Sequence, residues 1–308
     1  MALLLIRSDK NYDSWLKALT DQNSGVQVYT PETVENPVEI TMALTWKAPK
    51  GSFSNYPNLK VIGSMGAGVD HLFDDPSLPQ NVTLTRVVDE KLSSDMQEFV
   101  LARCLNHIKD LEYYSHLQQQ VDWSPKQYRR VADVSVGILG FGTLGQAVGK
   151  KLANVGFKVS GWSHTRKEVS GIKSYTTAEL DSFLATSEIL ICLLPLTDQT
   201  RNILNLELFR KLPEKAYLIN VARGGHLNEA DLIAALEEGL LSGAALDVFN
   251  REPLPKDHKF WKRNDISITP HVASMSSAGS VAPQVVENYH RMEYGSELMN
   301  VVSREKKY

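Results

Sequence analysis

Residues 134–162, VSVGILGFGTLGQAVGKKLANVGFKVSGW, decide the fold of this chain. The stretch begins with β-branched and apolar residues and runs into a glycine cluster formed by Gly140, Gly142 and Gly145. Apolar residues at helical spacing follow the cluster, and Gly156 then provides a stop signal for that helix. A second apolar run closes the unit. The stretch therefore predicts a strand, a glycine turn, a helix and a second strand in succession.

The glycine cluster has the spacing of a dinucleotide-binding turn. Gly140 would make the tight turn, Gly142 would let a diphosphate approach the backbone, and Gly145 would let the helix pack closely on the strand. The first helical residues, Thr143 and Leu144, would then present unpaired N–H groups to an anion. Because the glycines lie inside a complete strand–helix–strand pattern, we predict a dinucleotide site here, with a purely structural turn as the alternative.

The turn after the second strand bears on the choice of cofactor. Enzymes that prefer NAD usually place Asp or Glu about 20 residues after the glycines, where the carboxylate binds the ribose 2′-hydroxyl. Here the strand is followed by Ser163, His164, Thr165, Arg166 and Lys167, and none of these residues is acidic. A carboxylate would repel a 2′-phosphate, whereas arginine and lysine would attract it. We therefore predict NADP(H) as the preferred cofactor and leave NAD(H) open as a second one; a solvated basic turn is the alternative.

The rest of the chain continues the alternation of strands and helices, and its length of 308 residues indicates about two domains. The N-terminal region has no GxGxxG motif, and its expected elements are strands at Leu3–Ile6, Val26–Tyr29, Ile40–Trp46, Val61–Ser64 and Thr83–Thr85 and a helix at Tyr12–Thr20. After the glycine unit, the expected strands are Glu188–Pro195, Ala216–Asn220, Ala244–Val248 and Ile266–Thr269. We therefore predict an α/β protein with doubly wound parallel sheets.

Residues 93–119 are predicted to form one long helix. Ser94 with Gln97 resembles a capping box, and an apolar stripe follows. The next residues, 120–133, are polar and irregular and carry two aromatic side chains, Trp123 and Tyr128. Exposed aromatic residues in such a stretch can mark a subunit contact, and a surface loop is the plainer interpretation.

Composition and charge exclude several classes of protein. The formal net charge of −3 does not indicate the excess of basic residues that is typical of nucleic-acid-binding proteins. The apolar run Ala2–Ile6 is too short for a membrane span or a signal sequence and is interpreted as a buried strand. Cys104 and Cys192 fall in apolar patterns and are expected in the core, so a reducing cytoplasm is the expected compartment. We predict no metal site and no nucleic-acid or membrane partner.

Ligands of open α/β sheets bind outside the carboxyl ends of the strands. The residues expected there are Leu194, Pro195, Val221, Ala222, Arg223, Asp247 and His271. Arg223 lies between small residues and could hold a carboxylate in bidentate fashion. Histidine is the side chain best suited to proton transfer near neutral pH, and Glu252 could pair with His271 and keep it charged. Taken alone, each residue could be an ordinary surface charge or a histidine that makes its hydrogen bonds within the protein. Together they are typical of an acid–base pair beside an arginine that binds a carboxylate.

Two features of the N-terminal region could also contact a ligand. The small-residue loop Gly66–His71 contains Ala67 and Gly68, and its backbone N–H groups could face a carboxylate or simply make a tight connection. Trp46 stands at the end of a predicted strand and could line a pocket, although its spacing alone favours the core.

The motifs together resemble those of the D-isomer-specific 2-hydroxyacid dehydrogenases, and the resemblance covers nearly the whole chain. The matching motifs are Gly140–Gly145, Leu194–Thr197 with Thr200, Asn220–Gly225, Asp247–Phe249 with Glu252–Pro255, and Thr269–Ala273. Within that family, the Gly66–His71 loop, the Trp46 segment and the Trp162–Lys167 turn are most similar to the glyoxylate/hydroxypyruvate reductase A group.

The resemblance implies two Rossmann-like domains and a homodimer. The substrate-binding (catalytic) domain would comprise residues 1–96 and 275–308, and the NADP-binding domain, residues 97–274, would be inserted into it. His164 differs from the motif of the glyoxylate/hydroxypyruvate reductase A group, in which arginine is expected at this position. Arg166 and Lys167 would therefore have to bind the 2′-phosphate.

The resemblance also implies roles for the site residues. Arg223 would bind the substrate carboxylate and polarise the keto group, His271 would donate a proton to the carbonyl oxygen, and Glu252 would keep that histidine protonated. Asp247 would contact the nicotinamide end of the cofactor. The substrate would also contact Trp46, Ala67 and Gly68. The cofactor would also contact the glycine turn, residues 163–167, Leu194, Pro195, Thr200, Val221 and Ala222.

We therefore expect an NADPH-dependent reductase that converts glyoxylate to glycolate and hydroxypyruvate to D-glycerate. Another D-2-hydroxyacid dehydrogenase, such as a phosphoglycerate dehydrogenase, is the first alternative, although such enzymes often carry an added C-terminal regulatory domain. A nucleotide-sensing corepressor is the second alternative. Because the positions of Arg223, Glu252 and His271 are all occupied, no loss of catalytic residues favours that second alternative.

Overall fold

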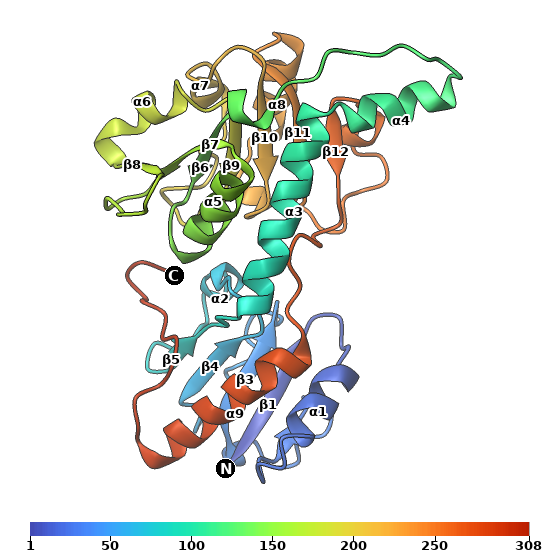
Figure 1. Ribbon diagram of the computed structural model, residues 1–308. Coiled ribbons are helices and arrows are strands. Elements are labelled where there is room, and N and C mark those ends of the chain that lie inside the picture. The colour runs from blue at the N-terminus through green and yellow to red at the C-terminus, as the bar shows by residue number, and fades with distance from the viewer. Residues whose placement is uncertain (308) are drawn as a thin grey trace. The chain divides into compact units, whose positions relative to one another are not determined.

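The computed structural model describes residues 1–307, which divide into two compact units. The first unit comprises Met1–Leu92 together with the segment from Met275 onward, and the second unit comprises Ser93–Ser274. The sequence analysis places this junction after residue 96 instead. Each unit has its own sheet (Figure 1). Each also has its own hydrophobic clusters.

The sheet of the first unit has five parallel strands in the order β2-β1-β3-β4-β5. The strands are β1 (Ala2–Arg7), β2 (Val28–Tyr29), β3 (Ile40–Trp46), β4 (Val61–Ser64) and β5 (Thr83–Thr85). The helices are α1 (Asp13–Thr20), α2 (Asp70–Phe73) and α9 (Ala278–Tyr294), the last contributed by the C-terminal segment. All five strands that the sequence predicts are therefore present.

Alternate residues of β1 pack on opposite faces of this sheet. Leu3 and Leu5 belong to a buried cluster that includes Trp15 and other residues of α1 and α9, and these two helices lie on the same face (Figure 1). Leu4 and Ile6 belong to a second cluster on the opposite face. Because it is covered on both faces, β1 is a nearly continuous apolar run, as expected for a central parallel strand.

The sheet of the second unit has seven parallel strands in the order β12-β11-β10-β9-β6-β7-β8. The strands are β6 (Ser135–Leu139), β7 (Lys158–Trp162), β8 (Lys173–Tyr175), β9 (Ile189–Cys192), β10 (Ala216–Asn220), β11 (Leu241–Leu246) and β12 (Ile266–Ile268). The chain order reverses at β6, which has β7 on one side and β9 on the other. Such a reversal is the point at which doubly wound sheets bind their ligands.

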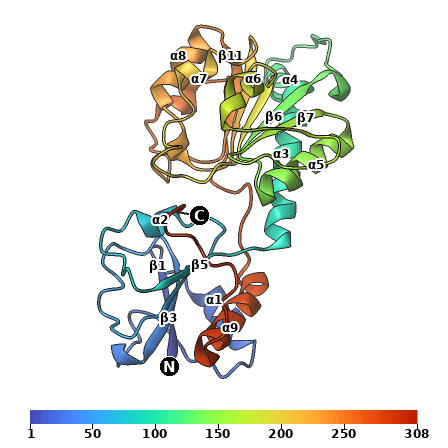
Figure 2. The same cartoon turned by 90° about the vertical axis from the view of Figure 1, so that its left-hand side faces the viewer.

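Helices cover both faces of this second sheet (Figure 2). One hydrophobic cluster joins the sheet to α3 (Glu90–Ile108) and α5 (Thr143–Val155). The other joins it to α6 (Leu180–Leu184), α7 (Leu206–Phe209) and α8 (Glu229–Glu237). The predicted α/β fold with doubly wound parallel sheets is thus confirmed.

The prediction of one helix over residues 93–119 is wrong. The structure has α3, which ends at Ile108, and a separate α4 (Leu111–Gln119). Asp110 between them adopts a left-handed conformation with φ of +53°, which a continuous right-handed helix does not permit. The capping box is also wrong, because α3 begins at Glu90, so Ser94 lies inside it and the Gln97 amide donates to the Ser93 carbonyl oxygen.

The second sheet also differs from the prediction at two strands. The sequence analysis does not predict β8, a three-residue edge strand that pairs only with β7 among the described strands. The strand expected at Ala244–Val248 begins earlier, at Leu241, and ends before Asp247.

Cys104 and Cys192 are both buried and form no disulfide. Burial raises the pKa of each thiol to about 12, so neither is a nucleophile near neutral pH. Within residues 1–307, no helix is long and apolar enough to cross a membrane. The same residues contain no cluster of three His, Cys, Asp or Glu side chains arranged to hold a metal ion.

Candidate active site

The glycine turn joins β6 to α5 and has the geometry of a cradle for a diphosphate. Gly140 has a φ of +110°, which favours glycine, and a Cβ there would lie 2.6 Å from the backbone of Leu193. A Cβ on Gly145 would overlap the carbonyl oxygen of Gly140, so the helix can pack on the turn only through glycine. A Cβ on Gly142 would meet no atom within 4 Å, which leaves open space on that side of the turn.

The N-terminus of α5 has no side-chain cap. Gly142 is the N-cap residue, and the helix begins with Thr143 and Leu144, whose N–H groups belong to the first turn. Gly156 ends the helix in a left-handed conformation with φ of +109°, as predicted. The open space beside Gly142 and the uncapped helix end together fit an anionic group such as the diphosphate of a dinucleotide.

The turn after β7 holds the five residues predicted to select the cofactor. Ser163 Oγ donates to the carbonyl oxygen of Thr165 at 2.8 Å, and Lys167 Nζ donates to Oγ1 of the same threonine at 2.9 Å. Nδ1 of His164 lies 3.2 Å from Oγ1 of Thr177. These short-range bonds order an exposed, basic turn at the carboxyl end of the strand.

Arg166 in this turn has an acidic partner that the sequence analysis does not identify. Its Nη2 lies 2.7 Å from Oε2 of Glu179, and its Nη1 donates to the carbonyl oxygen of Ser174 at 2.6 Å. The hydrogen bond from Arg166, followed by those from Thr176, lowers the pKa of Glu179 to about 2, so this carboxylate is charged at neutral pH. The only signal for it in the sequence is the capping box that Thr176 forms with Glu179.

The loop after β9 is closed by Thr200. Its Oγ1 donates to the carbonyl oxygen of Pro195 at 2.7 Å and accepts the N–H of Thr197 at 2.8 Å. Leu194 is buried at the start of the loop, and the carbonyl oxygen of Pro195 also lies 3.3 Å from Nε2 of the fully buried His226. His226 thus connects this loop to the segment that carries Arg223.

The loop after β10 carries Arg223, preceded by the buried residues Val221 and Ala222. The Asn220 side chain holds the loop in shape, because it accepts the N–H of Ala222 at 3.2 Å and donates to the carbonyl oxygen of Arg223 at 3.1 Å. A Cβ on Gly224 would overlap the backbone of Phe249, so the loop lies directly against the segment that follows β11.

The loops after β11 and β12 meet through Asp247, which is 1% exposed. Its two carboxylate oxygens accept the N–H groups of Val272 and Ala273, each at 2.9 Å. Its carbonyl oxygen accepts the N–H of His271 at 2.8 Å. Asp247 therefore fixes the turn that presents His271, whose backbone has a φ of +56°.

Glu252 and His271 contact each other directly. Nδ1 of His271 lies 2.9 Å from Oε2 of Glu252, and both side chains are largely buried, at 27% exposed for the histidine and 20% for the glutamate. Oε1 of Glu252 accepts the N–H of Phe249 at 3.1 Å. The structure thus brings together the acid–base pair that the sequence analysis describes, on the same sheet edge as the loop of Arg223.

Trp46, Ala67 and Gly68 lie in the first unit. Gly66 packs under the Trp46 ring, since a Cβ there would come 2.9 Å from the indole, and the Trp46 and His71 rings are 5.1 Å apart. Ser64 Oγ donates to the carbonyl oxygen of Gly68 at 2.8 Å. Trp46 is therefore half-buried, packing both against this loop and against a hydrophobic cluster of the first unit.

Comparison with known proteins places the chain in a family. Residues 101–273 match the family described as D-isomer specific 2-hydroxyacid dehydrogenase, NAD binding domain. The chain belongs to this family. The predicted family, and with it the predicted class of NAD(P)-dependent dehydrogenase, is confirmed.

Similar proteins extend over most of the chain. The glyoxylate/hydroxypyruvate reductase A of Yersinia enterocolitica is 41% identical over 84% of this chain and 85% of its own. The enzyme of the same name from Serratia proteamaculans is 38% identical over 95% of each chain. These relatives support the group that the sequence analysis identifies.

Two solved structures superpose on the whole fold. The NADPH-dependent glyoxylate/hydroxypyruvate reductase of Sinorhizobium meliloti, in complex with NADP and sulfate, has a TM-score of 0.94 and 38% identity, and covers 100% of this chain and 99% of its own. The D-isomer specific 2-hydroxyacid dehydrogenase of Xanthobacter autotrophicus Py2, in complex with NADPH and MES, has a TM-score of 0.94 and 39% identity with the same coverage.

Proposed function

We propose that this protein is an NADPH-dependent reductase of short 2-keto acids that converts glyoxylate to glycolate and hydroxypyruvate to D-glycerate. The observation that carries the proposal is the 2.9 Å pair of Glu252 and His271, at the carboxyl edge of the sheet that also bears the glycine turn. The names of the similar proteins and the NADP(H) bound in two of their structures support it.

NADP(H) fits the residues at the ends of β6 and β7. The diphosphate would lie on the uncapped N-terminus of α5, beside the open space at Gly142, and Arg166 and Lys167 would attract the 2′-phosphate. When bound, the reduced cofactor supplies a hydride to the keto carbon. Further contacts to the cofactor are assigned to Thr143, Leu144, Gly145, Ser163, His164, Thr165, Leu194, Pro195, Thr200, Val221, Ala222 and Asp247. NAD(H) is the weaker cofactor in this proposal.

Arg223 and His271 would act on the substrate. The Arg223 guanidinium would bind the carboxylate and polarise the neighbouring keto group. Because Nδ1 of His271 is bound to Glu252, the proton for the carbonyl oxygen would come from Nε2. The Glu252 carboxylate lies at hydrogen-bond distance from Nδ1 and holds the ring in one orientation. Trp46, Ala67 and Gly68 complete the proposed set of substrate-binding residues.

The domain roles and the assembly belong to the same proposal. Residues 1–96 and 275–308 would bind the substrate and residues 97–274 the cofactor. A homodimer is supported by Val121, Trp123 and Tyr128, which are 94%, 96% and 65% exposed in the segment after α4. The two unpaired cysteines are compatible with a cytoplasmic enzyme.

The consumption of NADPH with a panel of short 2-keto acids tests the proposal. Rapid turnover of glyoxylate or hydroxypyruvate with NADPH, and slow turnover with NADH, is the expected result. A preference for NADH would overturn the cofactor assignment. No turnover of any 2-keto acid by a protein that still binds NADPH would overturn the assignment as a reductase and favour a nucleotide sensor.

A further inference from the structure

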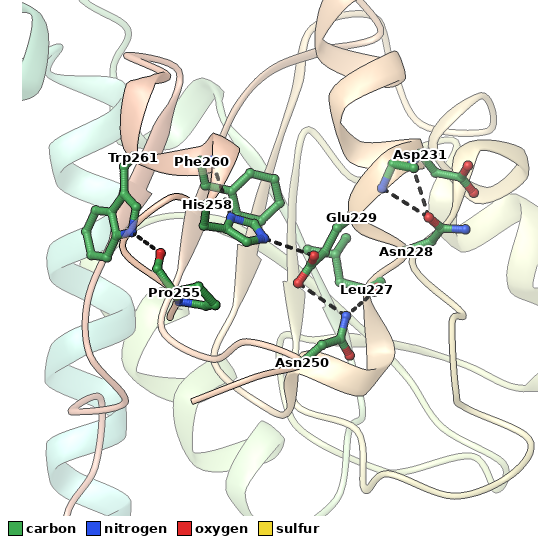
Figure 3. A network of polar contacts seen from close by, with 10 residues as sticks. Leu227, Asn228, Glu229, Asp231, Asn250, Pro255, His258, Phe260 and Trp261 are labelled. Atoms are coloured by element: carbon green, nitrogen blue, oxygen red, sulfur yellow. Dashed lines mark hydrogen bonds and ion pairs between the residues drawn. The ribbon is translucent and has the colours of Figure 1, made fainter. Parts of the chain in front are cut away.

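A second histidine–glutamate pair lies beside the loop that carries Glu252. Nε2 of His258 lies 3.2 Å from Oε2 of Glu229, which is the first residue of α8 (Figure 3). Their side chains are 20% and 29% exposed, so the contact is largely shielded from water. The proposed mechanism gives this pair no task.

The ring of His258 has a defined tautomer. Its Nδ1 accepts the N–H of Phe260 at 3.3 Å and therefore carries no hydrogen. The ring hydrogen is on Nε2 and is donated to Glu229. Phe260 is 1% exposed, so the backbone that fixes this ring is itself anchored in the core. His258 is thus an anchored hydrogen-bond donor, and its geometry does not suit a proton carrier.

The Glu229 carboxylate also binds Asn250, which precedes Glu252 in the sequence, whereas His258 follows it. Nδ2 of Asn250 donates to Oε1 of Glu229 at 3.2 Å and lies 3.4 Å from the carbonyl oxygen of Leu227. Figure 3 shows His258 and Asn250 converging on Glu229 from the two ends of the loop. One carboxylate on α8 therefore connects both ends of the segment 250–258, with Glu252 between them.

The position of Glu252 depends on this loop, because the side chain must reach Nδ1 of His271 while Oε1 binds the N–H of Phe249. We propose that Glu229 is a positioning residue which, through His258 and Asn250, holds the Glu252 carboxylate on His271. This inference rests on the proposed function, since it assigns Glu229 a task in the same proton transfer. Glu229 acts on the reacting pair through the loop, since its carboxylate oxygens accept from the two ends of that loop.

The variant Glu229→Gln tests the proposal with little change of shape. A glutamine has one acceptor oxygen, so it can serve Asn250 or His258 but not both, and its amide faces the remaining donor. We expect kcat with hydroxypyruvate and NADPH to fall roughly tenfold, because a misplacement of about 1 Å can cost about a hundredfold and a loosened loop should displace Glu252 by less than that. The dissociation constant of NADPH should stay unchanged, since the glycine turn is not touched.

A double variant separates positioning from mere structural support. If Glu229 acts through the Glu252 carboxylate on His271, Glu229→Gln should lower kcat hardly any further once Glu252→Gln has already changed that carboxylate. Asp247, the other carboxylate at this turn, still binds the N–H groups of Val272 and Ala273 in every variant.

Two further variants and one control complete the test. His258→Phe and Asn250→Ala each remove one of the two bonds and should lower kcat with an unchanged dissociation constant of NADPH, which keeps the test informative if Glu229→Gln does not fold. Glu238→Gln makes the same charge change at the other end of α8, where the side chain pairs with Arg210 at 3.4 Å, and should leave kcat and the His271 resonance unchanged.

The NMR resonance of the proton between Nδ1 of His271 and Glu252, in the full-length protein without substrate, gives a readout independent of turnover. Its chemical shift should change in Glu229→Gln as it does in Glu252→Gln. Folded variants with a wild-type kcat, or with a lower kcat but an unchanged resonance and a full further loss in the double variant, would overturn the positioning role. If the wild type reduced no 2-keto acid, the proposed function would fail, while the resonance would still test the link between Glu229 and His271.

Discussion

Arg166 is the cation whose geometry is best defined in the turn after β7, because Glu179 and the Ser174 carbonyl oxygen hold it. Arg166→Ala should raise the KM of NADPH about tenfold and leave that of NADH nearly unchanged, because only NADPH offers a phosphate for a charge-assisted contact. Steady-state kinetics with both cofactors measure this. Arg210→Ala, which removes another exposed ion pair, is the control, and equal losses with NADPH and NADH would contradict the assignment.

Arg223 differs from Arg166 in that its proposed task is on the substrate. Arg223→Ala should lower kcat/KM for hydroxypyruvate by about a thousandfold, because the substrate carboxylate and the developing charge on the keto oxygen lose their partner. Arg223→Lys keeps the charge without the bidentate fork, so an intermediate loss is expected. The measurement is kcat/KM together with the NADPH dissociation constant. Near-normal turnover in Arg223→Ala would show that Arg223 does not bind the substrate carboxylate.

At the scale of elements, the glycine turn allows two neighbouring substitutions to be contrasted. Gly145→Ala should lower the melting temperature and the NADPH affinity together, because a Cβ there overlaps the Gly140 carbonyl oxygen and pushes α5 away from β6. Gly142→Ala should keep the wild-type melting temperature, since its Cβ meets no atom within 4 Å, but weaken NADPH binding about tenfold or more by filling the space meant for the diphosphate. Calorimetry and cofactor titration measure the two effects. If both variants behaved alike, the roles given to the two glycines would be wrong.

Elements with a local signal could be predicted from the sequence. Gly156 caps the C-terminus of α5, and Asn228 caps the N-terminus of α8, where its side chain accepts the N–H groups of Ala230 and Asp231. Each of these caps has its own typical residue type, which the sequence shows. The break at Asp110 could not be predicted in this way, since neither glycine nor proline marks it. The strand β8 is too short for any periodicity to show.

The candidate site could be predicted to a similar extent. Glu252 and His271 were identifiable because their residue types and strand-end positions point to acid–base chemistry. Glu229 was not, because an acidic residue in the first turn of a helix is explained by the helix dipole alone. Its contacts with Asn250 and His258 join the start of α8 to both ends of the segment 250–258, and only the folded chain brings these together.

At the scale of the whole molecule, a half-buried histidine that packs on the second sheet links stability to pH. The ring of His107 on α3 stacks on Tyr217 of β10 with 3.8 Å between centroids, and burial lowers the pKa of His107 to about 4, partly opposed by Asp110 and Glu112. Its pKa in the unfolded chain is about 6.5. Between these values the unfolded state binds more protons, so the free energy of unfolding should decrease as the pH falls from about 6.5 towards 4.

The expected loss from His107 over that interval is of order 2 kcal/mol, because a tenfold difference in proton affinity between the folded and unfolded chains corresponds to about 1.4 kcal/mol and partial solvent access reduces the effect. Urea unfolding of the wild type and of His107→Phe, at several pH values between about 4 and 7, measures it. The phenylalanine keeps the stacked ring but cannot bind a proton, so its stability should depend less steeply on pH. An equal slope in His107→Phe and the wild type would place the acid sensitivity in another group of the fold.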